Sequence, residues 1–122
     1  MNFKSLYNYF VMQPEGMWIM KGDNAFALYQ FIKRHPIKRI LDLGTGIGCS
    51  ASIMALALKE KGVDGHIDSL EQYDKCVVLA NKIIPQELKK YITIHKAEIE
   101  LWQPKEIPYQ AFINFKDATG IR

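Results

Sequence analysis

The sequence predicts an α/β fold built on a short parallel sheet. Three strand-like segments, residues 39–43, 65–71 and 91–95, alternate with segments of helical periodicity. A glycine-rich loop at residues 44–48 joins the first of these strands to the next helix. Strands that alternate with helices favour parallel pairing through right-handed crossovers. We therefore expect a β-α-β-α-β unit preceded by an N-terminal helix.

Length and composition fit one globular domain. The chain has 122 residues, of which 48% are hydrophobic and 24% are charged, and this excludes a natively disordered chain. Sixteen basic and thirteen acidic residues give a formal net charge of +3. Dedicated nucleic-acid binders are more basic and carry a clustered basic face. A nucleic-acid partner is therefore not expected.

The two cysteines and the apolar segments bear on location. Cys49 and Cys76 lie within apolar helical patterns and lack partners at metal-ligand spacing, so we interpret both as small core residues. The first residues lack the apolar region of a signal peptide, and the most apolar stretch, 47–58, is far shorter than the ~20 residues of a membrane helix. These features predict a cytoplasmic protein without a membrane span or a metal site.

The first 21 residues are rich in aromatic residues and methionine, and Pro14-Glu15-Gly16 interrupts them. Such a segment is typical of a cover over part of a core, and a lining for a ligand site is the alternative. A first clear helix is predicted over residues 24–34, with Asp23 as its N-cap. Pro36 ends this helix because the residue before a proline avoids the α region.

The glycine loop leads into a second helix, which runs to about Lys61 and stops at Gly62. The strand at 65–71 has a poor strand composition, and its prediction depends on its place between two helices.

A third helix is predicted with Asp74 as its N-cap, and Pro85 closes it. The segment 91–95 is β-branched and aromatic, as expected of a strand. After it the tail carries prolines at 104 and 108, and a short helix is expected at about 109–116.

The most informative segment is the loop that reads Asp42-Leu43-Gly44-Thr45-Gly46-Ile47-Gly48. Glycines let the backbone turn sharply and approach a ligand closely, and the helix that follows presents unpaired N–H groups. Glu71 ends the next strand, so the parallel sheet brings it to the same edge. A carboxylate there can accept both hydroxyls of a ribose. The pattern predicts a nucleoside-containing ligand.

The spacing of the loop separates two classes of such ligands. The dinucleotide fingerprint is G-x-G-x-x-G, whereas this loop is G-x-G-x-G and has Cys49 at the place of the third fingerprint glycine. Asp42 beside the loop would repel a pyrophosphate and would suit a ligand with an amino group. An NAD-binding fragment is therefore the less favoured alternative.

At this point the sequence resembles class I S-adenosylmethionine-dependent methyltransferases. The stretch 39–48 resembles their first motif, and Ser69-Leu70-Glu71 resembles the acidic end of their second strand. Ala97-Glu98, after the third strand, sits where that family often holds the adenine. The resemblance covers residues 24–98.

The resemblance implies a Rossmann-like, doubly wound parallel sheet with strand order 3-2-1-4-5-7-6. Only about three strands are evident here, which implies a truncated, N-terminal half of one S-adenosylmethionine-binding domain. Within it we expect a cap at 1–37, a cofactor-binding core at 38–98 and a tail at 99–122. No segment after Lys96 matches the family's fourth strand.

The missing fourth strand would leave the first strand as an open apolar edge. A partner chain, a second copy, the tail itself or further sequence would have to cover this edge.

The resemblance also implies roles at the site. The loop backbone would cradle the methionine part of S-adenosylmethionine, and Asp42 would reach its amino group directly or through water. Glu71 would bind the ribose hydroxyls, while Gln72 and Glu98 would lie near the adenine, although both could be ordinary surface residues. The implied cofactor-binding residues are Asp42, Gly44, Thr45, Gly46, Gly48, Glu71, Gln72, Ala97 and Glu98.

The function that the resemblance implies is methyl transfer from S-adenosylmethionine to an acceptor that the sequence does not identify. A non-catalytic S-adenosylmethionine-binding module or subunit is the alternative. Methyl transfer depends mainly on the alignment of donor and acceptor. His35, His66 and His95 have no recognisable catalytic context, so we assign no catalytic residue.

Overall fold

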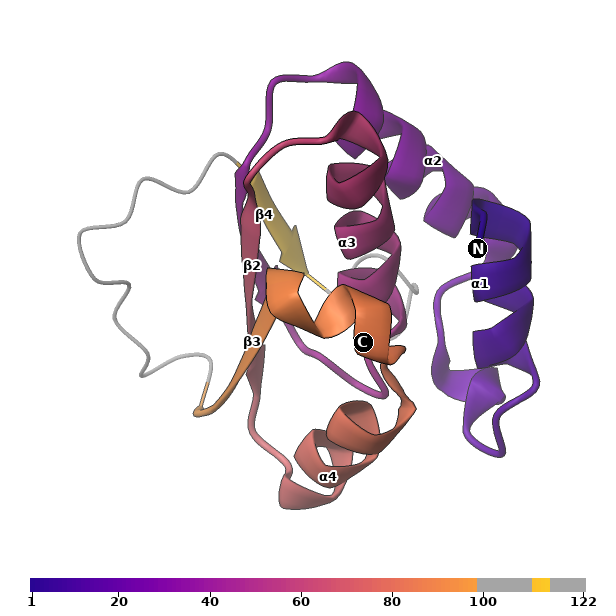
Figure 1. Cartoon of the computed structure of the whole chain (residues 1–122). Coiled ribbons are helices and arrows are strands. Elements are labelled where there is room, and N and C mark those ends of the chain that lie inside the picture. The colour runs from indigo at the N-terminus through magenta and orange to yellow at the C-terminus, as the bar shows by residue number, and fades with distance from the viewer. Residues whose placement is uncertain (99–110, 115–122) are drawn as a thin grey trace.

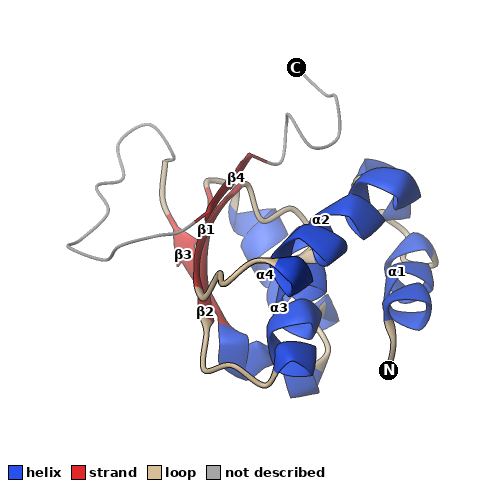
Figure 2. Cartoon of the chain, turned by 90° about the horizontal axis from the view of Figure 1, so that it is seen from above, coloured by secondary structure: helices blue, strands red, loops and turns tan. Residues whose placement is uncertain are grey.

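The structure is a computed structural model that describes residues 1–98 and the strand 111–114. Its centre is a four-stranded parallel sheet with the order β3-β2-β1-β4. Figures 1 and 2 show the four labelled helices together on one face of this sheet. The strands are β1 (Arg39–Leu43), β2 (His66–Glu71), β3 (Ile92–Lys96) and β4 (Ala111–Asn114).

The helices follow the order expected from the sequence. The α-helices are α1 (Phe3–Val11), α2 (Gly22–Arg34), α3 (Cys49–Lys61) and α4 (Asp74–Ile83), and the short 3-10 helices are η1 (Gly16–Trp18) and η2 (Gln86–Tyr91). The three predicted strands and the helices between them are therefore confirmed. No helix among the described residues is long and apolar enough to cross a membrane.

Helix α3 forms the centre of the core. Its first ten residues, 49–58, are all buried, because α1 and α2 pack on one side of the helix and the sheet lies on the other. Phe10 of α1, Ile32 of α2 and Ile67 of β2 are wholly enclosed in the same core cluster as α3. This packing fixes the amino end of α3 relative to the strand ends, which is where the glycine loop lies.

Two helix starts differ by a residue or two from the prediction. Lys21 is the N-cap of α2, and Asp23 lies within its first turn. Tyr73 is likewise the N-cap of α4, and Asp74 is its first residue. In both cases the acidic side chain lies in the first helical turn, where a negative charge is still favourable to the helix dipole.

The largest correction concerns the tail. Residues 111–114 form β4, a strand parallel to β1 with Ile40 opposite Ala111 and Leu43 opposite Asn114. The predicted helix at 109–116 is therefore wrong over these four residues, and its other positions lie outside the described residues. Among the covers expected for the edge of β1, the tail is therefore the one that the structure shows. The run Ala111-Phe112-Ile113-Asn114 is too short to show a periodicity, so its pairing with β1 decides its structure.

Two tyrosine hydroxyls of α1 hold the N-terminal segment in place. The Tyr7 hydroxyl donates to the Met20 carbonyl at 2.7 Å, and the Tyr9 hydroxyl donates to the carbonyl of Ile83 at the end of α4. Met17 and Trp18 of η1 remain 78% and 59% exposed. The segment therefore covers part of the core, as predicted, and leaves two large apolar side chains on the surface.

Candidate functional site

The glycine loop lies at the carboxyl end of β1, where it leads directly into α3. Gly44, Gly46 and Gly48 have φ angles of 99°, 57° and 95°. These are left-handed values that side chains other than glycine rarely adopt. The three glycines are thus required by the path of the loop itself.

The loop is tied to the neighbouring strand and closely packed against α4. The amides of Gly44 and Thr45 both donate to the Leu70 carbonyl of β2, each at 3.0 Å. Gly48, the N-cap of α3, lies so close to Ile84 that a Cβ on it would be 2.5 Å from the Ile84 Cγ1 atom. Since Gly48 has no capping side chain, the first amides of α3 are available to an anionic group of a ligand.

Glu71 connects the glycine loop to the start of α4. Its side chain is 5% exposed, and its Oε1 atom accepts the Gly46 amide at 2.9 Å while Oε2 accepts the Tyr73 amide at 3.1 Å. Each carboxylate oxygen has a second acceptor site. The same carboxylate can therefore hold the loop and still accept two hydroxyl donors from a ligand.

Asp42 is wholly buried behind the loop, 0% exposed. The Ser69 hydroxyl donates to its Oδ2 atom at 2.7 Å, and the Ser50 hydroxyl lies 3.2 Å from Oδ1 and 3.3 Å from Oδ2. Burial raises the pKa of Asp42 to about 7, and the nearby charge of Glu71 also raises it, whereas the bonds from Ser69 and Ser50 lower it. The structure thus places Asp42 in the wall of the site, where these hydroxyls surround it.

The thiol at the start of α3 has an ordinary structural role. Cys49 is buried, and burial raises its pKa to about 12, with a smaller contribution from the charge of Asp42. A thiol in this state is a poor nucleophile. Cys76 is also free, and its pKa is raised by partial burial and by Glu71.

The remaining predicted site residues lie along the same edge. Ala97 donates its amide to the Glu71 carbonyl at 2.9 Å, which brings the end of β3 against the end of β2. Gln72 and Ala97 are half-buried, and Glu98 is exposed. The structure therefore joins the loop, Glu71 and Ala97 by hydrogen bonds.

Three groups that bond the carboxyls of the candidate site were not predicted from the sequence: the hydroxyls of Ser50 and Ser69 and the Tyr73 amide. Ser50 of α3 and Ser69 of β2 are buried polar residues, 1% and 0% exposed. Polar residues at buried positions require hydrogen-bond partners, and Asp42 is the partner here. The signal that could have identified Ser50 was its hydroxyl in the first turn of α3, two residues after Gly48.

Each histidine bonds to a partner outside this cluster. His35 bonds the Phe31 carbonyl at 2.8 Å, His66 bonds the Thr93 hydroxyl at 2.7 Å, and His95 pairs with Asp68 at 2.8 Å. Within the described part of the chain, no group of three or more His, Cys, Asp or Glu residues could hold a metal ion.

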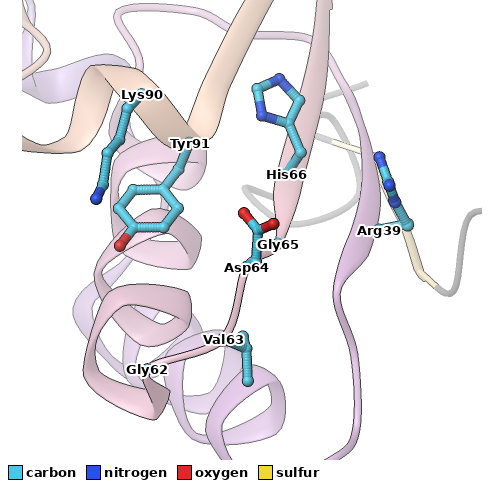
Figure 3. A pocket seen from close by; sticks show the side chains of 8 residues that line it. All are labelled: Arg39, Gly62, Val63, Asp64, Gly65, His66, Lys90 and Tyr91. Atoms are coloured by element: carbon cyan, nitrogen blue, oxygen red, sulfur yellow. The ribbon is translucent and has the colours of Figure 1, made fainter.

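A pocket of about 540 Å³ lies at the opposite, amino end of the strands. Figure 3 shows His66, Asp64 and Tyr91 around it, with Lys90 beside Tyr91 and Arg39 across the strands. The Lys90 ammonium lies 5.1 Å from the centre of the Tyr91 ring. This pocket shares no lining residue with the glycine loop.

Comparisons with known proteins agree with the geometry. The family model of protein-L-isoaspartate(D-aspartate) O-methyltransferase (PCMT) matches residues 20–119. A comparison with curated protein sequences finds no match.

Several solved methyltransferase structures share the fold. The O-methyltransferase TomG from Streptomyces achromogenes, in complex with SAM, is 18% identical, with a TM-score of 0.72 over 94% of this chain and 54% of that chain. The SAH-bound methyltransferase PaMTH1 from Podospora anserina is 13% identical, with a TM-score of 0.70 over 93% and 49%. An O-methyltransferase from Bacillus cereus in complex with SAH is 16% identical, with a TM-score of 0.68 over 92% and 52%.

The chain thus spans about half the length of these structures. It nevertheless carries the loop, the acidic strand end and the four-strand order expected of the cofactor half, and the family model matches most of its length. The chain belongs to the protein-L-isoaspartate(D-aspartate) O-methyltransferase family.

Proposed function

We propose that the chain binds S-adenosylmethionine at the glycine loop and forms the cofactor-binding half of a methyltransferase. The observation that carries this proposal is the bond from the Gly46 amide to Glu71 Oε1, 2.9 Å long, between the loop and the end of β2. It sets a hydroxyl-accepting carboxylate beside a glycine backbone and the open amino end of α3. Two of the three structural neighbours named above are described as bound to SAH and the third as bound to SAM.

The residues take distinct roles in this proposal. Glu71 accepts the two ribose hydroxyls through the acceptor sites that its bonds to the Gly46 and Tyr73 amides leave unused. The first amides of α3, after Gly48, bind the carboxylate of the methionine part. Asp42 acts on the ligand through Thr45 and Ser69 and by its charge, because its own carboxyl is enclosed.

S-adenosylmethionine supplies an electrophilic methyl group on a sulfonium, so the chain's task is to bind and to orient. A rigid loop suits this task, since a small misplacement of a reacting group is costly in rate. The loop is fixed by the amides of Gly44 and Thr45 on β2 and by Glu71 on the other side.

The descriptions of the relatives support one class of acceptor. The family description, TomG and the Bacillus cereus protein are all O-methyltransferases, so we propose transfer to an oxygen atom. The acceptor pocket would come from further sequence, a partner chain or a second copy placed beyond β4. Both thiols are free, which suits a reducing, cytoplasmic location.

A titration of the purified chain with S-adenosylmethionine, S-adenosylhomocysteine and NAD tests the proposal. We expect micromolar binding of the first two ligands and none of NAD. Gly46→Val is the matched variant, because a β-branched side chain at a φ of 57° distorts the loop and fills the space of the ligand. Binding of NAD alone would support the dinucleotide alternative, and equal binding by folded Gly46→Val would show that the loop is only a turn.

Methyl transfer is tested separately from binding. Radiolabelled S-adenosylmethionine is incubated with the chain and an isoaspartyl peptide or a catechol. Transfer to either would support an enzyme, whereas tight binding without transfer by the chain in any assembly would support a binding module.

A further inference from the structure

A chain of hydrogen bonds leads from the buried carboxyl of Asp42 to the glycine loop. The Ser69 hydroxyl donates to Asp42 Oδ2 at 2.7 Å, and the Thr45 hydroxyl lies 2.6 Å from the same Ser69 oxygen. All three side chains are buried. Thr45 sits between Gly44 and Gly46, so the chain ends within the loop that is proposed to hold the ligand.

Hydroxyl groups can both donate and accept, which makes this chain reversible. When Asp42 is ionised, Ser69 donates to it and Thr45 in turn donates to Ser69. When Asp42 is protonated, it can donate to Ser69, and Ser69 then donates to Thr45. The direction of the Thr45 hydroxyl, at the ligand, therefore depends on a proton that the ligand does not touch.

The charges around Asp42 make its ionised form costly in the free protein. Ser50 on α3 and Ser69 on β2 supply only hydroxyls, and within the described residues Asp42 forms no ion pair. Among the described residues, the titratable groups that face it are Glu71 from β2 and Cys49 from α3, and neither is a cation. A buried carboxyl without a cation favours its protonated state.

We propose that the Asp42–Ser69–Thr45 chain links binding of S-adenosylmethionine to the release of one proton from Asp42 to solvent. The inference rests on the proposed cofactor site. S-adenosylmethionine carries a sulfonium and an ammonium group, which stabilise a nearby carboxylate. Binding then lowers the pKa of Asp42, which lies at about 7 in the free protein. By linkage, the affinity rises with pH through this range.

The linkage also separates the cofactor from its product. S-adenosylhomocysteine has lost the sulfonium charge and stabilises the Asp42 carboxylate less. We therefore expect the affinity for S-adenosylmethionine to rise about three- to tenfold between pH 6 and 8, and the affinity for S-adenosylhomocysteine to rise by about twofold or less. The product would then be released more readily at the higher pH, relative to the substrate.

The test is calorimetric titration at pH 6.5 in two buffers of different ionisation enthalpy. At this pH the cofactor's own amino group, with an ordinary pKa of about 8, stays protonated. We expect wild type to release more than about half a proton per S-adenosylmethionine bound, and Asp42→Asn to release almost none. A carboxyl-detected NMR titration of Asp42, with and without ligand, measures directly how far binding lowers the pKa of Asp42.

Two further variants test the chain of hydroxyls and keep the carboxyl. Ser69→Ala removes the middle link, Thr45→Val removes the last hydroxyl with little change of shape, and each should at least halve the proton release. Ser52→Ala is the matched control, because Ser52 is equally buried on α3 and its hydroxyl has no partner among the described residues. It should leave the release unchanged.

Each outcome has a defined meaning even if Asp42→Asn does not fold. Unchanged proton release in Ser69→Ala and Thr45→Val would overturn the role of the chain, and unchanged release in Asp42→Asn would overturn the role of Asp42. In both cases S-adenosylmethionine still binds, so the proposed function stands. Absence of S-adenosylmethionine binding by wild type would overturn both.

Discussion

The two ends of the sheet differ in what helix α3 presents to them. At the carboxyl end, α3 begins at Gly48 with uncapped amides, in front of Glu71 and the enclosed Asp42. At the amino end, the same helix stops at Gly62, whose amide bonds the Leu58 and Lys59 carbonyls. The charged pocket beside that second end is lined by surface residues such as Arg39, His66 and Lys90.

This difference shows that a measurable hollow and a binding site are separate properties. The amino-end pocket has volume, but its basic side chains are exposed or half-exposed and the nearby helix end carries a partial negative charge. The carboxyl end has three glycines in left-handed conformations, the uncapped first amides of α3 and the buried carboxyls of Asp42 and Glu71. Fixing a glycine costs backbone entropy and burying a carboxyl costs desolvation, so both lower stability. Groups that lower the stability of the free protein in this way are expected at a site where binding of a ligand offsets that loss.

The largest effect should come from a side chain at Gly48. Gly48→Ala adds a Cβ 2.5 Å from Ile84 Cγ1 at a φ of 95°, so we expect a loss of about 3 to 5 kcal/mol in the free energy of unfolding. Gly62→Ala is the matched control at the other end of α3, because its φ is 71° but no atom lies within 4 Å of the new Cβ. We expect it to cost only about 1 kcal/mol. Urea denaturation measures both variants. Equal losses of unfolding free energy in Gly48→Ala and Gly62→Ala would mean that the Ile84 side chain moves aside at no cost.

The next effect is a pH dependence that only the carboxyl end should show. Because burial raises the pKa of Asp42 from 3.8 to about 7, the folded state binds its proton more tightly than the unfolded state does. Stability is therefore lost as pH rises from about 4 to 7 and changes little above that range. As pH rises from 5 to 8, we expect the unfolding free energy of Asp42→Asn to increase by about 2 to 3 kcal/mol relative to that of wild type. Parallel stability profiles of the two proteins in urea denaturation would contradict the buried, protonated carboxyl.

Binding of S-adenosylmethionine should separate two roles of Glu71. Glu71→Ala removes the acceptors of the ribose and also of the Gly46 and Tyr73 amides, so we expect the dissociation constant to rise more than about tenfold. Glu71→Gln keeps one oxygen and should weaken binding less. Glu87→Ala, an exposed residue paired with Lys59, is the control and should bind as wild type does. An unchanged dissociation constant for Glu71→Ala in calorimetry would reject the ribose role.

The same contrast explains what could be predicted from the sequence. The carboxyl end was predictable because its chemistry is local: the loop Gly44–Gly48 must turn, and Glu71 must end a strand. The hydroxyls of Ser50 and Ser69 escaped prediction because their meaning depends on Asp42, which they reach only in the folded chain.

Strand β4 escaped for a related reason. Its four residues, 111–114, follow two prolines and have no alternation to distinguish strand from helix. Only the parallel register with β1, with Asp42 opposite Ile113, makes the segment a strand. Of the coverings that the sequence left open for the edge of β1, the structure shows the tail. The local pattern could not choose among them, because pairing between segments distant in the sequence leaves no local signal.

The smallest effect is expected from substitutions in the pocket at the amino end of the strands. Its basic residues lie at the far end of the strands from Glu71, so His66→Ala and Lys90→Ala should change the affinity for S-adenosylmethionine by less than about twofold, since exposed charges are screened over a ~10 Å Debye length. Calorimetry under the conditions used for Glu71→Ala measures both. A loss comparable to that of Glu71→Ala would place the cofactor at the wrong end of the sheet. If these two variants bind normally and Glu71→Ala does not, the ligand lies at the end where α3 begins. In the part of the chain that the structure describes, this end offers uncapped amides and a carboxylate bonded to the loop.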